Sequence, residues 1–205
     1  MILRNLPAEF LREGSYLRVS ERCHMKGEYM KTPALKTERL LLRPLQSDDA
    51  ECVFMNWTSD PEVARFMRWE VHKNVLETQQ WLASEETLIE SDTVYNWGFV
   101  LKSTGELIGS GGLVYRESDR MYELGYNIMK RYWNQGLTTE AARAIIDFGK
   151  NELKQTKFYC CHAKNNPASG RVMEKIGFRY QNDGVYYSWN REKRFECMEY
   201  LLNIE

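Results

Sequence analysis

The spacing of apolar residues along the chain switches repeatedly between the period of a strand and the period of a helix. Strands are predicted where apolar positions alternate or run together, at residues 40–42, 95–101, 106–115, 122–129 and 157–163, with two more aromatic-rich strands after Phe178. Helices are predicted where apolar residues recur every three or four positions, at residues 75–89, 142–153 and 167–176. Together these elements predict an α/β (α+β) architecture, a largely continuous sheet interrupted by helices.

Short polar signals mark where several of these elements begin or end. Four polar residues each precede a predicted helix and carry a side chain that can accept a hydrogen bond from a free backbone amide: Ser47, Asp60, Asn74 and Asn166. Pro61 suits the first position of its helix because that position needs no amide hydrogen. Gly105 ends a Ser-Thr-Gly turn between two predicted strands and predicts a hairpin.

The beginning of the chain differs from the rest. Residues 1–33 show no sustained period and are interpreted as an N-terminal appendage, in which only Ala8 to Leu17 is expected to form a short helix. Residues 34–205 are expected to form one domain. Lys26-Gly-Glu-Tyr-Met30 back-translates to a purine-rich ribosome-binding sequence just before an ATG codon. We therefore hypothesise that residues 1–29 are a translated leader of a bacterial gene.

Charge and composition narrow the class of partner. The 205 residues carry 28 Lys and Arg against 29 Asp and Glu, so neither nucleic acid nor a membrane surface is expected as a partner. No apolar stretch approaches the roughly 20 residues that span a bilayer. The five cysteines form no C-x-x-C pair and are interpreted as reduced thiols of a cytoplasmic protein. The histidines have no ligand-like spacing, so no metal site is expected. The oligomeric state stays open between monomer and homodimer.

The segment from Tyr122 to Glu140 is predicted to be a strand, a loop and a helix in turn. A helix start presents unpaired backbone N–H groups, and Gly136 would let an anion approach them closely, so the segment is a candidate pyrophosphate cradle. The alternative is that Gly136 merely closes a turn. Neither G-x-x-x-x-G-K-[ST] nor G-x-G-x-x-G occurs, which argues against nucleotide-hydrolase and dinucleotide sites.

Four segments carry a resemblance to a known family: Thr37-Glu-Arg-Leu-Leu-Leu-Arg-Pro44, Trp133-Asn-Gln-Gly-Leu-Thr-Thr-Glu-Ala141, Asn166-Pro-Ala-Ser169 and Glu174-Lys-Ile-Gly-Phe178. They resemble the GNAT superfamily of N-acetyltransferases, and within it the ribosomal-protein N-terminal (alanine/serine) acetyltransferases. The resemblance covers roughly residues 34 to 205. It implies a mixed, mostly antiparallel sheet of about seven strands, splayed open between the strands that end near Met129 and Ala163. Acetyl-CoA would lie in that cleft as a co-substrate.

The resemblance also implies which residues hold acetyl-CoA. The backbone of Ile128, Met129 and Lys130 would pair with the pantetheine arm, and an amide near Met129 would bind the thioester oxygen. The remaining implied cofactor-binding residues are Gln135, Gly136, Leu137, Thr138 and Thr139, through their amides, and Asn166 and Arg171, through their side chains; Lys130 is a further candidate for the phosphates. Thr138 departs from the small residue common in the family, and its hydroxyl could bind the phosphate or crowd it.

Three positions bear on the chemistry of proton transfer. Glu123 is the implied general base, acting through a water, and the alternative is a strand glutamate paired with a cation. Ser169 is a candidate proton donor to the thiolate, and the alternative is a polar residue in a helical first turn. Met173 stands where many relatives carry an acidic tyrosine, and a thioether has no proton to give. Glu140, next to the anion site, is expected to turn away from the phosphate and to interact with the helix start.

The acceptor is expected to be a primary amine, either a protein N-terminus or a small-molecule amine. Large side chains of the early helices and the last hairpin either line its pocket or belong to the core: Trp57, Phe66, Met67, Trp69, Tyr186, Tyr187 and Trp189. Two other functions stay open. One is a non-catalytic acyl-CoA sensor, suggested by Met173, and the other is an interaction domain with the same fold, suggested by Thr138.

Overall fold

The structure is a computed structural model that describes residues 31–204. The short helix predicted at Ala8 to Leu17, the hypothetical leader and Cys23 lie outside the described residues. Within residues 31–204, no helix is long and apolar enough to cross a membrane.

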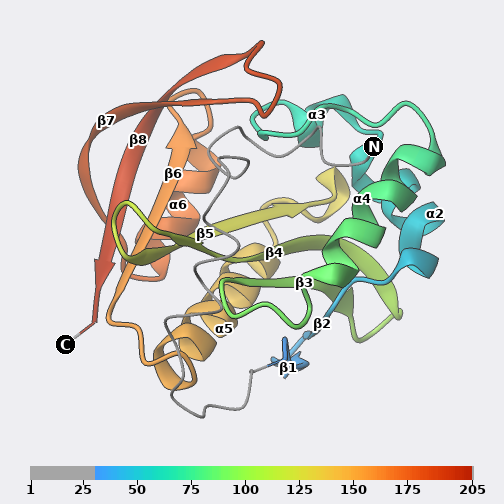
Figure 1. The fold of residues 1–205 in the computed structure, drawn as a ribbon, viewed down its shortest axis with the longest axis horizontal. Coiled ribbons are helices and arrows are strands. Elements are labelled where there is room, and N and C mark those ends of the chain that lie inside the picture. Colours follow the sequence, from blue (N-terminus) through green and yellow to red (C-terminus); the bar gives the residue numbers. More distant parts are fainter. Residues whose placement is uncertain (1–30, 205) are drawn as a thin grey trace, which may run out of the picture.

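One eight-stranded sheet, in the order β1-β2-β3-β4-β5-β6-β8-β7, forms the centre of the domain (Figure 1). Its strands are β1 (Leu35–Lys36), β2 (Leu40–Arg43), β3 (Val94–Leu101), β4 (Glu106–Arg116), β5 (Met121–Ile128), β6 (Lys157–Ala163), β7 (Arg179–Tyr187) and β8 (Arg194–Asn203). Every described pairing is antiparallel except that of β5 with β6. The mixed, mostly antiparallel sheet is therefore confirmed, and β1 is the strand that the apolar pattern missed.

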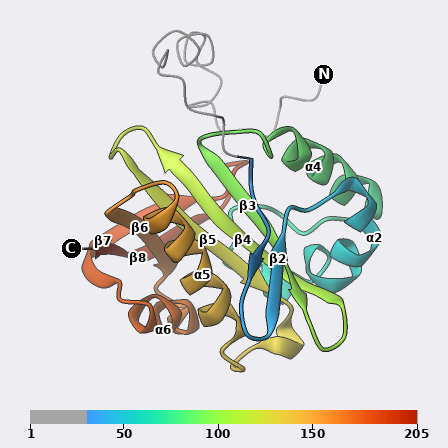
Figure 2. The same ribbon diagram turned by 90° about the horizontal axis from the view of Figure 1, so that it is seen from below.

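The described helices differ widely in length, from three residues in the shortest to 13 and 15 in the two longest. They are η1 (Ser47–Asp49), α2 (Ala50–Val53), η2 (Phe54–Thr58), α3 (Pro61–Ala64), α4 (Val75–Thr87), η3 (Lys130–Tyr132), α5 (Leu137–Asn151) and α6 (Pro167–Lys175). Figure 2 shows α5 and α6 together along one part of the sheet and α2 and α4 along another. Helix α5 packs on β4 and β5, and α6 packs on β6.

The apolar face of α5 holds it on the sheet. Ala142, Ile145 and Ile146 are buried on that face, and Phe148 packs edge-on against Trp97 of β3 with 5.2 Å between ring centroids. Burying a large apolar side chain contributes about 1.5–3 kcal/mol. This packing fixes where α5 begins relative to the end of β5.

The predicted helix caps are confirmed at two of four positions, Asp60 and Asn74. The Oδ1 atoms of Asp60 and Asn74 accept hydrogen bonds from the amides of Glu62 and Glu77. Ser47 was expected to cap but is instead the first helical residue, because its hydroxyl donates to Glu86, 2.7 Å away. The hairpin turn between β3 and β4 is confirmed, with Gly105 at φ 72°.

Candidate active site

Strands β5 and β6 run side by side for a short distance and then part. Their parallel pairing covers only Tyr122 with Phe158 and Glu123 with Tyr159. Directly beyond it, the Leu124 carbonyl accepts a hydrogen bond from the Cys160 thiol at 3.0 Å instead of from a backbone amide of β6. We call residues 124–128 and 160–163, between which the backbone pairing is lost, the β5–β6 opening. It lies where the resemblance implied that the sheet splays.

The edge of β5 that faces the β5–β6 opening offers backbone groups for pairing. The Met129 amide donates to the Ile108 carbonyl at 2.8 Å and therefore points towards β4. Because successive amides of a strand point to opposite sides, the Ile128 amide points into the opening. The Ile128 carbonyl is held by the Trp133 indole N–H at 2.9 Å. The Met129 amide is therefore engaged, and the amide near Met129 that is available to a thioester oxygen is that of Ile128.

The loop after β5 ends in a helix start whose amides are unoccupied. Gly136 is the N-cap of α5, with a left-handed backbone at φ 77° and no side-chain capping bond. Its carbonyl accepts the Glu140 amide at 3.0 Å, which begins the helix. Among residues 31–204, no partner is recorded for the amides of Leu137, Thr138 or Thr139. Together with the positive end of the helix dipole, these donors suit an anion such as a pyrophosphate.

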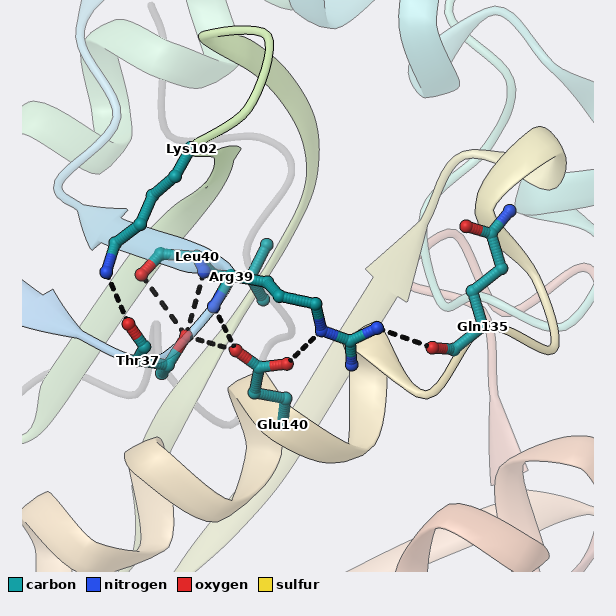
Figure 3. A network of polar contacts seen from close by, with 6 residues as sticks. All are labelled: Thr37, Arg39, Leu40, Lys102, Gln135 and Glu140. Carbon is teal, nitrogen blue, oxygen red and sulfur yellow. Dashed lines mark hydrogen bonds and ion pairs between the residues drawn. The ribbon is translucent and has the colours of Figure 1, made fainter.

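The acidic residue in this first turn points away from the free amides. Glu140 accepts hydrogen bonds from the Thr37 hydroxyl at 2.5 Å, the Arg39 amide at 2.7 Å and the Arg39 Nε at 2.7 Å (Figure 3). Partial burial raises the pKa of Glu140, but these hydrogen bonds outweigh it and leave the pKa below its ordinary value. The expected partner was the helix start, and the structure instead places the carboxylate at the turn between β1 and β2.

Of the two basic residues expected near the phosphates, one is in an ion pair and the other is in none recorded for residues 31–204. Lys130 is ion-paired with Glu62 of α3, and the hydrogen bond from this pair raises the pKa of Lys130. Arg171 is exposed on α6 and has no recorded partner within the described residues. Arg171 is free to meet a phosphate, whereas Lys130 must first leave Glu62.

The first turn of α6 lies beside the β5–β6 opening. Asn166 occupies the N-cap position before Pro167, but the predicted capping by its side chain is wrong because the side chain makes no such bond. The Tyr126 hydroxyl reaches from β5 to Ser169, 3.0 Å from both its carbonyl and its Oγ. Burial raises the pKa of Tyr126 well above its ordinary value, so Tyr126 holds its proton tightly. Met173 is fully buried and supplies packing.

Glu123 lies on the face of β5 opposite Tyr126, with two guanidinium groups around it. Its carboxylate is 3.4 Å from Arg68 Nη2 and 3.2 Å from Arg116 Nη1, and 26% of the side chain is exposed. Arg116 also pairs with Asp119 at 2.5 Å and lies over the Tyr159 ring. The structure thus shows the alternative predicted for Glu123, a strand glutamate paired with cations. It leaves a partly exposed carboxylate that an ammonium group could approach.

Open space adjoins Glu123 on the same face of β5. Side chains two residues apart on a strand share a face, so Gly125 follows Glu123 there. Gly125 is exposed, and a Cβ built on it would meet no atom within 4 Å. The polar amide of Asn127 follows next. Its Nδ2 donates to the Ser110 hydroxyl at 2.7 Å, and its Oδ1 is buried without a hydrogen-bond partner among residues 31–204. This face therefore has room for a substituent beside a carboxylate.

Comparison with known proteins decides the family. Residues 39–179 match the family model described as an acetyltransferase (GNAT) domain. This chain belongs to the GNAT acetyltransferase family. Two proteins of Bacillus subtilis are similar to it. The uncharacterized protein YkkB is 32% identical, covering 77% of this chain and 90% of YkkB, and the uncharacterized N-acetyltransferase YoaA is 29% identical, covering 75% of this chain and 85% of YoaA.

Solved structures of GNAT proteins share the fold. A GNAT-family acetyltransferase from Bacillus anthracis is 25% identical with a TM-score of 0.70, covering 83% of this chain and 98% of that one. A ribosomal-protein-S5-alanine acetyltransferase from Vibrio fischeri is 16% identical with the same TM-score of 0.70, covering 83% and 97%. The second likeness concerns the fold alone.

Other titratable residues of this acetyltransferase lie in the core. His162 is buried, with Nδ1 2.9 Å from the Ala163 carbonyl and its ring beside Tyr200. Cys160 and Cys161 point to opposite faces of β6, and burial raises the pKa of the Cys161 thiol to about 12. Within residues 31–204, no group of three or more His, Cys, Asp or Glu side chains could hold a metal ion.

The large side chains expected around the acceptor divide into core and surface. Trp57 is fully buried, and the Tyr186 hydroxyl donates to the Phe66 carbonyl at 2.7 Å. Tyr187 and Trp189 of the last hairpin each keep 43% of their surface exposed. The Trp189 amide donates to the Arg68 carbonyl at 2.7 Å, which joins the hairpin to the segment that carries Arg68.

Three arginines whose partners lie on other elements of the fold were not predicted from the sequence. Arg39 reaches Glu140 and Gln135, and Arg68 and Arg116 reach Glu123. Arg39 lay within a segment that carried the resemblance, but neither arginine around Glu123 had a local signal. Their roles emerge only when the strands are paired.

Proposed function

We propose that this GNAT protein transfers the acetyl group of acetyl-CoA to a primary amine by direct attack in a ternary complex. The observation that carries the proposal is the parting of β5 and β6 beside the unoccupied amides at the start of α5. Membership of the family and the similarity to the uncharacterized N-acetyltransferase YoaA support it.

The donor side fits acetyl-CoA through backbone groups. The amides of residues 136–139 would hold the pyrophosphate, and Thr138 offers a hydroxyl that has no recorded partner within residues 31–204. The free edge of β5 at Tyr126 and Ile128 would pair with the amides of the pantetheine arm. The Asn166 side chain and Arg171 supply further polar groups along the same path.

The acceptor side provides a route for protons. Glu123 would accept a proton from the ammonium group through a water, which frees the nitrogen lone pair to attack the thioester carbon. The C–N bond forms, the nitrogen gives up its second proton to water, and the C–S bond breaks. The thiolate takes a proton from water, or from the Ser169 hydroxyl, which water then reprotonates. The Ile128 amide would donate to the thioester oxygen as negative charge develops there.

The acceptor class in this proposal is a primary amine of a peptide N-terminus or of a small molecule. Peptide N-termini are included because a ribosomal-protein-S5-alanine acetyltransferase shares this fold, a likeness that concerns the fold alone. The exposed rings of Tyr187 and Trp189 support an acceptor with apolar groups near the amine, because such rings bury apolar surface on binding.

Release of free thiol from acetyl-CoA tests the proposal. The protein is assayed with peptides that begin with Ala or Ser, with the same peptides blocked at the N-terminus, and with polyamines and aminoglycosides. We expect turnover with at least one free amine and none with its blocked form. Saturable binding of acetyl-CoA without turnover on any amine would indicate a sensor. Failure to bind acetyl-CoA would reject the proposal.

A further inference from the structure

Arg39 connects the turn between β1 and β2 to the loop that precedes α5. Its Nη1 donates to the Gln135 carbonyl at 3.0 Å, while its Nε and its own amide both donate to Glu140. Figure 3 shows the guanidinium lying between the Glu140 carboxylate and the backbone of Gln135. The side chain is 44% exposed, so this arrangement is held by directed hydrogen bonds more than by burial.

The hydrogen bond to Gln135 sets the direction of the next amide. The peptide bond is planar, and the described residues contain no cis peptide, so a carbonyl and the following N–H point in opposite directions. When Arg39 holds the Gln135 carbonyl, the Gly136 N–H must point away from Arg39. Two residues around this peptide have a left-handed backbone: Asn134, which precedes Gln135, with φ 60°, and Gly136, with φ 77°. Such a loop needs an outside anchor to keep one conformation.

Arg39 also compensates the charge of Glu140. A carboxylate in the first turn of α5 competes with a bound anion for the positive end of the helix and repels it. Arg39 and Thr37 together occupy the carboxylate with three hydrogen bonds. The Arg39 Nη2 lies 3.5 Å from the place where a Cβ on Gly136 would stand, so its positive charge is next to the loop.

We propose that Arg39 is a positioning residue for the pyrophosphate of the acetyl donor. It orients the Gln135–Gly136 peptide towards the anion and neutralises Glu140, without itself entering the reaction. The inference rests on the proposed function, and it assigns to the β1–β2 turn a part in donor affinity. The consequence is selective: donors that contain the pyrophosphate need Arg39, and donors that lack it do not.

Arg39→Gln tests this with three donors: acetyl-CoA, acetyl-dephospho-CoA, which keeps the pyrophosphate but lacks the 3′-phosphate, and S-acetyl-pantetheine, which lacks both. Loss of hydrogen bonds to charged groups predicts that KM and Kd rise roughly 10- to 100-fold for the first two. We expect kcat to stay within about twofold, and kcat/KM for S-acetyl-pantetheine to match that of the wild type. Arg143→Gln is the matched control, because Arg143 also lies at α5 but donates to Lys175.

The outcomes separate the two proposals. If the wild type neither binds nor consumes acetyl-CoA, the proposed function fails. If the wild type does both and Arg39→Gln keeps the wild-type KM for acetyl-CoA, only the positioning role fails. An equal loss with all three donors would also overturn it, because that is the effect of a structural residue. A loss with acetyl-CoA alone would assign Arg39 to the 3′-phosphate and contradict the inference.

Discussion

The two sides of the β5–β6 opening present different polar groups. On one side, between Ile128 and Thr139, the polar groups are backbone amides. On the other side, around Glu123, they are side chains. The amides belong to one continuous stretch of chain. The carboxylate of Glu123 meets Arg68 and Arg116, which come from the α3–α4 connection and from β4. A backbone site tolerates changes of side chain and depends on conformation, while a side-chain site depends on the identity of each residue. The two sides should therefore respond differently to substitution.

The largest expected effect is on the backbone side. Gly136→Val places a β-branched residue at φ 77°, which costs about 1–3 kcal/mol of strain, and puts a side chain beside the free amides. We expect acetyl-CoA binding to be lost. In the wild type, acetyl-CoA at 100 times Kd should add about 2.7 kcal/mol of stability, which corresponds to a rise in Tm of roughly 5 to 10 °C.

Gly105→Val is the matched control for this substitution. Gly105 has φ 72° and lies in the β3–β4 turn with open space around it. Both variants should lose similar stability, but only Gly136→Val should lose the rise in Tm with acetyl-CoA. A full rise in Tm for Gly136→Val would place the pyrophosphate elsewhere.

The second effect concerns Glu123. Glu123→Gln keeps the shape and removes the basic group, so kcat/KM at neutral pH should fall by roughly 10²- to 10⁴-fold while Kd for acetyl-CoA stays unchanged. The loss should shrink as pH rises, because a larger fraction of the acceptor is then free amine and needs no base. The pH profile of kcat/KM measures this.

Asp119→Asn is the control for Glu123→Gln, since Asp119 pairs with the same Arg116. We expect it to change kcat/KM by less than about threefold. Full activity of Glu123→Gln at neutral pH would remove Glu123 from proton transfer and leave only its ion pairs.

A smaller effect on chemistry is expected at Met173. The side chain is fully buried, so Met173→Ala should lower the free energy of unfolding by about 2–5 kcal/mol through the cavity it leaves. Because the thioether gives no proton, kcat/KM measured below the Tm should change little. Urea denaturation and the thiol-release assay together separate stability from chemistry. A large loss of kcat without a loss of stability would mean that Met173 contacts the reacting groups.

Most elements were predictable because their apolar spacing is local. Strand β6 matches its predicted range of residues 157–163, and α6 differs from its prediction only in ending at Lys175. Strand β1 has two residues, which is too short to show a period. The fold as a whole was expected through the resemblance carried by the segments around Gly136 and Ser169, and the family match confirms it.

The parts of the site that one continuous segment forms were predictable from the sequence. The prediction failed where strand register, or a partner distant in the sequence, determines the contact. The direction of the Met129 amide depends on the pairing of β5 with β4, which no local pattern reveals. The partner of Glu140 is Arg39, which lies 101 residues away in the sequence. The helix start was predicted as the partner because it is near Glu140 in the sequence. Asn166 occupies the expected cap position, but its backbone at φ −118° and ψ 64° leaves its side chain without a capping bond.

The central claim is that backbone amides at the start of α5 and at the end of β5 bind the acetyl donor. Titration of ¹⁵N-labelled protein with acetyl-CoA, followed through the backbone amide resonances, tests it at single residues. The account predicts the largest saturable shifts at Gly136, Leu137, Thr138 and Thr139 and a clear shift at Ile128. Met129, whose amide is bound to Ile108, should shift much less than Ile128. Saturable binding that leaves the four α5 amides unmoved would contradict the account.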